Sequence, residues 1–189
     1  MPYVTCPACG LATYCVREDD CPRCATRLLA PSALRRRASA RVQGGPADGS
    51  VLRALDLAVR ELSVDVAMVS EVAEGRETVL WTVGSDRFPD WRPDASLPLD
   101  ETVCERLLSG RIANIVPDID EEPELAGLDA LRDAGLRAYV GVPLTATDAR
   151  LYVLCCIAGE ARHDLTDADV RFLKGLAESL RPALDRGHV

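Results

Sequence analysis

Four cysteines near the start of the chain constrain its folding more than any other feature. They form two matched pairs separated by eleven residues, Cys6-Pro7-Ala8-Cys9 and Cys21-Pro22-Arg23-Cys24. In each pair the proline fixes φ and favours a tight turn that directs both sulfurs to one place. Two such turns supply four thiolates, the tetrahedral ligand set that Zn²⁺ prefers. We therefore expect one structural zinc ion per chain, with the ligands Cys6, Cys9, Cys21 and Cys24.

The cysteine module resembles a zinc ribbon and is assigned to residues 1–30. It has almost no apolar core, so metal binding would supply its folding free energy, on the order of 10 kcal/mol. A rubredoxin-like iron centre is the alternative, because the two kinds of knuckle look alike. Such centres usually have aromatic residues beside the metal, and this module has only Tyr3 and Tyr14. Four thiolates close the coordination shell, which argues against a catalytic zinc.

Length and composition limit the class of protein. The 189 residues, of which 48% are hydrophobic, suit one ordinary domain and a small module. The sequence contains no apolar run of roughly 18 residues and does not begin with the basic and apolar segments of a secretory signal. We therefore expect a cytoplasmic protein that does not enter a membrane. In that reducing compartment, eight cysteines indicate metal binding and free thiols rather than disulfides.

Charge divides the chain unevenly. Residues 1–49 contain seven Arg and four acidic residues, a net charge of +3, whereas the remainder carries −11 of the total of −8. The acidic part is a poor general nucleic-acid binder, and only the N-terminal part has the sign that phosphates attract. Residues 31–49 read as a flexible basic linker. Arg35–Arg37 and Arg41 either contact a nucleic acid or acidic partner or form a solvated face, and four Arg are few for specific DNA binding.

Regular hydrophobic periodicity begins near residue 50. Ser50 is expected to cap a first helix, and strands over 64–72 and 78–83 form a hairpin around the turn at 73–75. The pattern then predicts a loop over 84–98, a helix that is capped by Asp100 and ends at Gly110, and a strand over 112–116. A helix over 125–134 and strands over 137–144 and 151–158 follow. The final helix begins with a capping box formed by Thr166 and Asp169. This order predicts an α+β fold with a mostly antiparallel sheet and helices at both ends of the domain.

Residues 50–189 resemble a GAF domain, the small-molecule-sensing relative of the PAS fold. The resemblance rests on five segments in the right order and spacing, over residues 97–104, 109–118, 135–144, 151–156 and 165–173. It implies a GAF/PAS-like antiparallel sheet flanked by helices, with a ligand pocket between the sheet and the neighbouring loops. It also implies a homodimer, because such domains commonly dimerise through their terminal helices, here residues 51–63 and 166–186.

The resemblance also indicates which residues border the ligand pocket: Trp91, Cys104, Val116, Asp118, Tyr139 and Cys156. It does not identify the ligand. The Asn-Lys-Phe-Asp-Glu run of the cyclic-nucleotide binders is absent, and no His lies near a candidate cysteine, which argues against a bilin chromophore. Ala149 and Val153 stand where the family usually has glycine. The first makes a tight turn less favourable, and the second narrows the pocket.

Cys104 can be interpreted in two ways. Its place near a helix N-terminus favours a lowered thiol pKa, and with it redox sensing or covalent ligand attachment. Alternatively it is simply a small buried residue, as free cysteines often are. Free methionine-sulfoxide reductases are GAF domains that use pocket cysteines, but residues 114–118 lack the second cysteine they need. Cys155 and Cys156 are consecutive on a strand and should face opposite sides of the sheet.

Together these features predict a non-enzymatic signalling or regulatory protein. Its GAF domain senses a small molecule, and its zinc ribbon docks a protein or nucleic-acid partner, since no effector domain follows residue 189. Two alternatives stay open. One is a transcription-associated regulator that binds nucleic acid, and the other is a thiol-redox sensor or methionine-sulfoxide-reductase-like enzyme that uses Cys104.

Overall fold

The computed structural model describes residues 3–5, 12–14, 19–20, 27–28, 46–84, 86, 88, 91–125 and 127–186. The chain divides into two units, Met1–Arg41 and Val42–Val189. In the first unit, two pairs of short antiparallel strands are described: β1 (Tyr3–Thr5) with β2 (Ala12–Tyr14), and β3 (Asp19–Asp20) with β4 (Arg27–Leu28). The four cysteines of the predicted zinc site and residues 31–45 of the predicted linker lie outside the described residues, so both stay predictions. Residues 46–49, predicted as the end of the linker, belong instead to the helix α1 (Pro46–Leu62).

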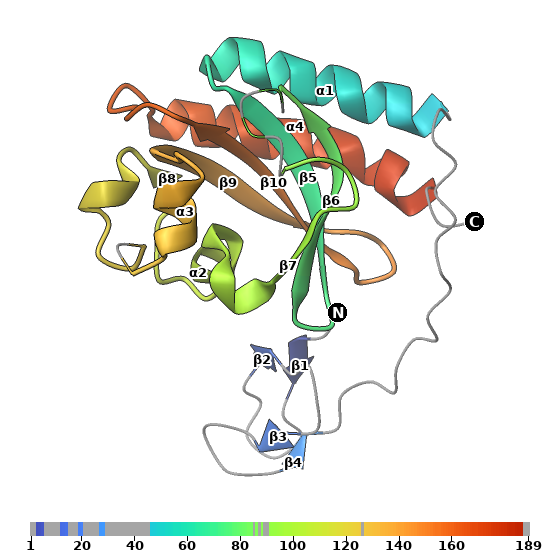
Figure 1. The fold of residues 1–189 in the computed structure, drawn as a ribbon. Helices are drawn as coiled ribbons and strands as arrows, with labels where there is room; N and C mark the ends of the chain where they lie inside the picture. The colour runs from blue at the N-terminus through green and yellow to red at the C-terminus, as the bar shows by residue number, and fades with distance from the viewer. Residues whose placement is uncertain are drawn as a thin grey trace. The chain divides into compact units, whose positions relative to one another are not determined.

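The second unit is built on a six-stranded antiparallel sheet in the order β7-β6-β5-β10-β9-β8 (Figure 1). The strands are β5 (Val66–Ala73), β6 (Arg76–Val83), β7 (Ser96–Pro98), β8 (Ile115–Val116), β9 (Ala138–Thr145) and β10 (Leu151–Ala158). All eight residues of β10 are buried, because this central strand is covered on both faces. That burial explains its unbroken apolar sequence. The predicted α+β class and antiparallel sheet are confirmed.

A tight hairpin joins β5 and β6. Glu74 and Gly75 form its two-residue turn, with φ values of 51° and 73°. Two consecutive positive φ angles are typical of the type I′ turn, whose twist matches that of antiparallel strands. The predicted hairpin is therefore confirmed. However, β6 begins at Arg76, two residues before the predicted start, and so Glu77 belongs to the sheet.

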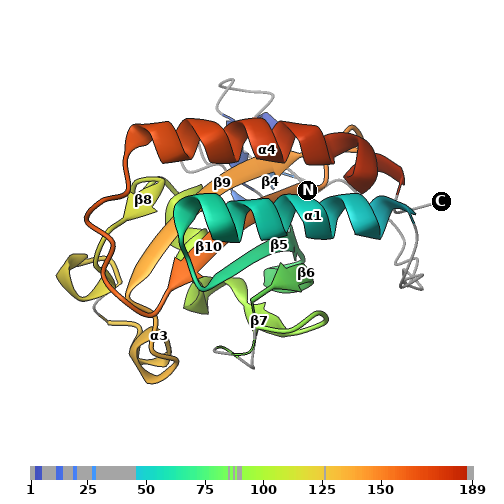
Figure 2. The same ribbon diagram turned by 90° about the horizontal axis from the view of Figure 1, so that it is seen from above.

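Two long helices, α1 (Pro46–Leu62) and α4 (Asp167–Arg186), lie side by side over one face of the sheet (Figures 1 and 2). The helix α1 starts at Pro46, so the predicted cap at Ser50 is wrong; proline suits the first helical turn because the N–H groups there have no helical partner. The predicted capping box of α4 is confirmed. The Thr166 N–H donates to an Asp169 carboxylate oxygen at 2.7 Å, and the Thr166 hydroxyl accepts from the Ala168 N–H.

Short segments cover the other face: η2 (Leu99–Glu101), α2 (Val103–Leu108), η3 (Ile119–Glu121) and α3 (Asp129–Asp133). Thr102 caps α2, because its hydroxyl accepts from the Glu105 N–H at 3.2 Å. The predicted cap at Asp100 is therefore wrong, since Asp100 lies in the preceding 3₁₀ turn. The strand predicted over 112–116 shortens to β8, and the helix predicted over 125–134 shortens to α3.

The turn between β9 and β10 forms without glycine. The Ala146 N–H donates to the Arg150 carbonyl at 2.9 Å, and Ala149 adopts a φ of 66°. Alanine in this left-handed conformation is strained, and the flanking strands impose it. Among the helices that the structure describes, none combines the length and the apolar character needed to cross a membrane.

Candidate functional site

A buried polar cluster lies on the face of the sheet opposite α1 and α4. It contains Glu77 of β6, Cys104 of α2 and Cys155 of β10, and one carboxylate oxygen and the two sulfurs all lie within 4.8 Å of one another. These three residues are 5%, 2% and 0% exposed. The hydroxyl of Tyr139, on β9, lies 3.4 Å from the Cys104 sulfur. One carboxyl group, two thiols and a phenol therefore meet in a core that is mostly apolar.

Strand alternation and one glycine bring these groups together. Cys155 pairs with Gly141 of β9, and Tyr139 lies two residues before Gly141 on the same face. A β-carbon built at Gly141 would lie 2.1 Å from the Tyr139 hydroxyl oxygen, so the ring covers the glycine closely. The missing side chain at Gly141 thus lets the phenol reach Cys104.

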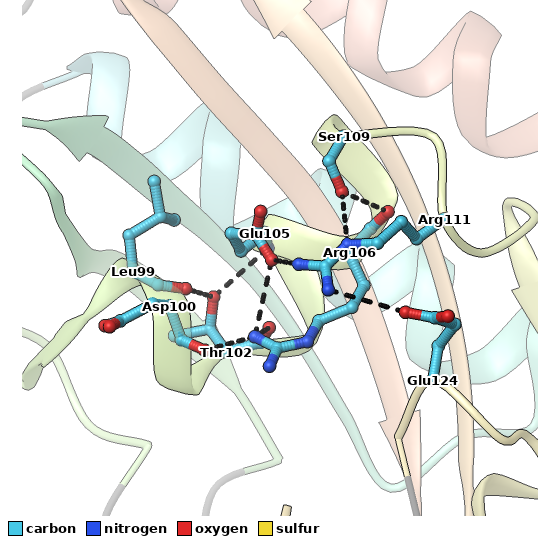
Figure 3. Close-up of polar contacts among 8 residues, drawn as sticks. All are labelled: Leu99, Asp100, Thr102, Glu105, Arg106, Ser109, Arg111 and Glu124. Atoms are coloured by element: carbon cyan, nitrogen blue, oxygen red, sulfur yellow. Dashed lines mark hydrogen bonds and ion pairs between the residues drawn. The ribbon is translucent and has the colours of Figure 1, made fainter.

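Polar contacts join α2 to the residues before and after it (Figure 3). Besides capping the helix, the Thr102 hydroxyl donates to the Leu99 carbonyl at 2.9 Å. Arg106 donates to the main-chain carbonyls of Asp100 and Thr102, and Arg111 forms an ion pair with Glu105. These contacts join α2 to the segments on either side of it. They fix the cysteine-bearing first turn of α2 over the sheet.

Burial controls the charge of the cluster. It raises the pKa of Glu77, and the neighbouring polar groups of Cys104, Thr102 and Ser70 offset only part of this effect. In the described part of the chain, no basic side chain forms an ion pair with Glu77. The carboxyl group is therefore shifted toward its neutral form.

The thiol of Cys104 is shifted in the same direction. Its hydrogen bond with Cys155, followed by burial and the nearby Glu77, raises its pKa well above the ordinary value. The structure does not support a thiol pKa lowered by the helix N-terminus; Cys104 agrees instead with the alternative interpretation, a small buried residue. A six-residue helix has a weak dipole, and its effect is outweighed by desolvation and an acidic neighbour. Burial likewise raises the pKa of Tyr139.

These shifts limit the chemistry of the site. Thiols attack as thiolates, so a buried thiol with a raised pKa is a poor nucleophile. The cluster is better suited to binding a ligand that replaces its protons than to attacking a substrate. This argues against the reading of Cys104 as a reactive redox centre.

Comparison with known proteins identifies the fold. A family model described as the GAF domain matches residues 47–185. The chain belongs to the GAF domain family. No curated protein matches the chain in sequence.

Solved structures of GAF domains show the same fold. A crystal structure of the cyanobacteriochrome receptor PixJ is 18% identical, with a TM-score of 0.61 over 75% of this chain and 97% of that one. The GAF domain region of a putative membrane protein from Geobacter sulfurreducens is 19% identical, with a TM-score of 0.56 over 73% and 92%. A phycocyanobilin-bound GAF domain from a cyanobacterial phytochrome is 17% identical, with a TM-score of 0.55 over 75% and 95%. At these identities the likeness concerns the fold.

The six residues predicted to border the GAF pocket are only partly brought together. Cys104 and Tyr139 meet in the cluster, Val116 is buried in the same apolar core, and Trp91 packs against it. Asp118 instead caps η3, and one of its carboxylate oxygens lies 2.7 Å from an Arg137 guanidinium nitrogen. This ion pair lowers the pKa of the Asp118 carboxyl group. Cys156 lies in the core beneath α1 and α4, on the opposite face of the sheet.

Two members of the cluster, Glu77 and Cys155, are not among the residues that the sequence patterns predict for the pocket. Strand alternation contained the signal for Cys155, because it shares a face with Val153, which was already expected beside the pocket. Glu77 was missed because the return strand of the hairpin was started at Thr78. An acidic residue next to a turn looks solvated unless the strand is known to include it.

Proposed function

We propose that this protein is a non-enzymatic signalling protein whose GAF domain binds a small ligand at the buried cluster of Glu77, Cys104, Cys155 and Tyr139. The observation that carries the proposal is the burial of these four side chains, all at most 5% exposed, among the apolar residues of this face. Burying polar groups costs free energy unless they find partners. A ligand that pairs with several of them at once recovers that cost, which gives the site both affinity and selectivity.

The proposed signal is a population shift. A ligand held by the cluster touches α2 on one side and β6, β9 and β10 on the other, so it favours one position of α2 relative to the sheet. The same strands carry α1 and α4 on their other face. Such domains commonly pair through these helices, and in a homodimer of this kind the exposed Leu52 of α1 would be covered. Ligand binding would then change how two copies pack.

The N-terminal part is proposed to be a zinc ribbon that docks a partner in the cytoplasm. Cys6 and Cys9 fall in the sequence between β1 and β2, and Cys21 and Cys24 fall between β3 and β4. This placement of two cysteine pairs in two hairpins supports the ribbon proposal. The net charge of +3 over residues 1–49 favours an acidic protein or a nucleic acid. DNA binding that weakens steeply with salt would identify the partner as a nucleic acid.

A bilin is an unsuitable ligand for this chain, although one structural relative holds phycocyanobilin. The sequence has two histidines, His163 and His188, and neither lies near a cluster cysteine in the sequence. The cluster instead offers a carboxyl group, a phenol and two thiols. Its chemistry suits a compact cationic or hydrogen-bonding ligand better than a large tetrapyrrole.

Native mass spectrometry of the full chain tests the proposed function. We expect a dimer that retains one zinc ion per chain in its N-terminal module and a further ligand that is lost on denaturation. A monomer with no ligand beyond that zinc, purified under reducing conditions, would contradict the proposal.

A further inference from the structure

We infer that Glu77, Cys104 and Cys155 form a binding site for a divalent metal ion of the Zn²⁺ type inside the GAF domain, distinct from the predicted N-terminal zinc site. The carboxylate oxygen and both sulfurs lie within 4.8 Å of one another. Two sulfurs bound to one tetrahedral zinc ion are about 3.8 Å apart, because each Zn–S bond is about 2.3 Å. The three groups therefore need to move by about 1 Å to share an ion.

The donor set selects the kind of metal. Two thiolates favour zinc and similar transition-metal ions over Mg²⁺ and Ca²⁺, which prefer oxygen. Three protein ligands leave a fourth position open for water or a small anion, as in zinc sites that exchange ligands. The predicted N-terminal site has four thiolates and offers no such position. The two sites of the chain would thus have different roles.

The surroundings of the cluster favour a cation. Glu77 is buried, and no basic side chain pairs with it in the part of the chain that the structure describes. A divalent ion supplies the missing positive charge and takes the place of the protons on the ligands. The Tyr139 hydroxyl, 3.4 Å from the Cys104 sulfur, is placed to donate to a metal-bound thiolate and to orient it. We assign Tyr139 as a positioning residue and not as a ligand.

A disulfide between Cys104 and Cys155 is the competing use of the same thiols. Its formation needs an external oxidant that accepts two electrons and two protons, and it leaves Glu77 without a role. The metal site uses all three residues. Glu77 therefore distinguishes the two chemistries, because its removal weakens metal binding and leaves both thiols free to be oxidised.

The three ligands come from different parts of the domain. Cys104 lies in the short helix α2, while Glu77 and Cys155 lie on two strands that are separated by β5. An ion would tie α2 directly to the sheet, in addition to the polar contacts that join this helix to its neighbouring segments. The inference deepens the proposed function by naming its ligand class. Only the signalling role of the metal rests on that function; binding itself does not.

Metal content of the full chain tests the site. We would strip the reduced protein with a chelator, reload it with Zn²⁺, and count bound ions by mass spectrometry. Cys104→Ser, Cys155→Ser and Glu77→Gln should each bind one ion per chain fewer than the wild type. Cys156→Ser is the matched control, because Cys156 is equally buried but lies on the other face, and it should keep the full count.

Equal metal content in all five proteins would overturn the inference, as would a disulfide between Cys104 and Cys155 that mass spectrometry detects in the denatured protein after reloading. If the serine variants fail to fold, a Co²⁺ titration of the wild type decides the matter. The inference expects two ions per chain, and a single ion with the spectrum of a four-thiolate site refutes it. If the metal binds but the dimer does not respond, the proposed function fails and the site stands. If an organic ligand is retained instead, the proposed function stands and the site fails.

Discussion

The two faces of the sheet differ in what covers them and in what they bury. Beneath α1 and α4 the core is almost entirely aliphatic, with Tyr152 and Cys156 as its exceptions. The opposite face is covered by short helices and loops, and it buries Ser70, Glu77 and Thr102 together with two thiols and the Tyr139 phenol. The helix face therefore buries few polar groups, whereas the cluster face buries several whose cost in free energy the proposed ligand would offset.

This contrast separates scaffold from site. Long amphipathic helices gain stability from the apolar area they bury, and a single polar group there would bring no benefit. A short helix such as α2 contributes less area but leaves its position adjustable. We expect substitutions on the helix face to change stability alone, and substitutions on the cluster face to change both stability and metal binding.

The largest effect is expected beneath the helices. Leu173 of α4 is fully buried, so Leu173→Ala should lower the free energy of unfolding by about 2–5 kcal/mol through lost burial and a residual cavity. Denaturant unfolding measures this loss. Because Leu173 lies on the helix face, the folded variant should bind as much Zn²⁺ as the wild type. Reduced metal content in the folded Leu173→Ala variant would contradict the division into a face that only stabilises the fold and a face that binds metal.

A smaller effect is expected at Gly141, below the cluster. Gly141→Ala places a β-carbon 2.1 Å from the Tyr139 hydroxyl oxygen, so the buried ring must move. Overpacking of this kind costs about 1–3 kcal/mol. The displaced phenol should also weaken metal binding, and a chelator-competition titration measures that affinity. Adding Tyr139→Phe to Gly141→Ala removes that oxygen and should restore part of the stability but not the affinity.

The cap of α2 provides a third test. Thr102→Ala removes the hydroxyl that accepts from the Glu105 N–H, and should cost about 1 kcal/mol of stability. Thr102→Ser keeps a hydroxyl and should behave like the wild type. Because α2 carries Cys104, the alanine variant should also release metal faster. Stopped-flow transfer of the metal to a coloured chelator follows that rate, and equal rates in the two variants would show that α2 does not hold the ion.

The smallest effect concerns Glu77 in the metal-free protein. Burial raises its folded-state pKa, so the folded protein binds more protons than the unfolded chain above the ordinary carboxyl pKa. The stability contributed by this group is complete below that ordinary value and is lost as the pH rises through the folded-state pKa. Glu77→Gln cannot ionise and should lack this loss. At acid pH the two proteins should differ by about 1 kcal/mol or less.

Denaturant unfolding at a series of pH values in the presence of chelator gives the comparison. The variant should become the more stable protein as the pH rises. Parallel stability curves would contradict the assignment of Glu77 as a buried, proton-binding carboxyl group.

The helix face was far more predictable from sequence than the cluster face. Strand β10 was predicted with its observed limits, and the α4 capping box was confirmed, because both follow from local patterns of apolar and capping residues. The cluster depends on contacts between residues distant in sequence, such as Cys104 and Tyr139. Nothing local marks Glu77 as buried, because its burial follows from the pairing of β6 and from the cover that η2 and α2 provide.

Hydrogen–deuterium exchange of the full chain, with Zn²⁺ and with chelator, tests the account most directly. We expect Zn²⁺ to slow exchange over α2, where Cys104 would be tied to the sheet. Cys155→Ser should abolish this protection, and Cys156→Ser should preserve it. Exchange over α2 that is the same with and without Zn²⁺, in wild-type protein shown to be folded, would contradict this expectation.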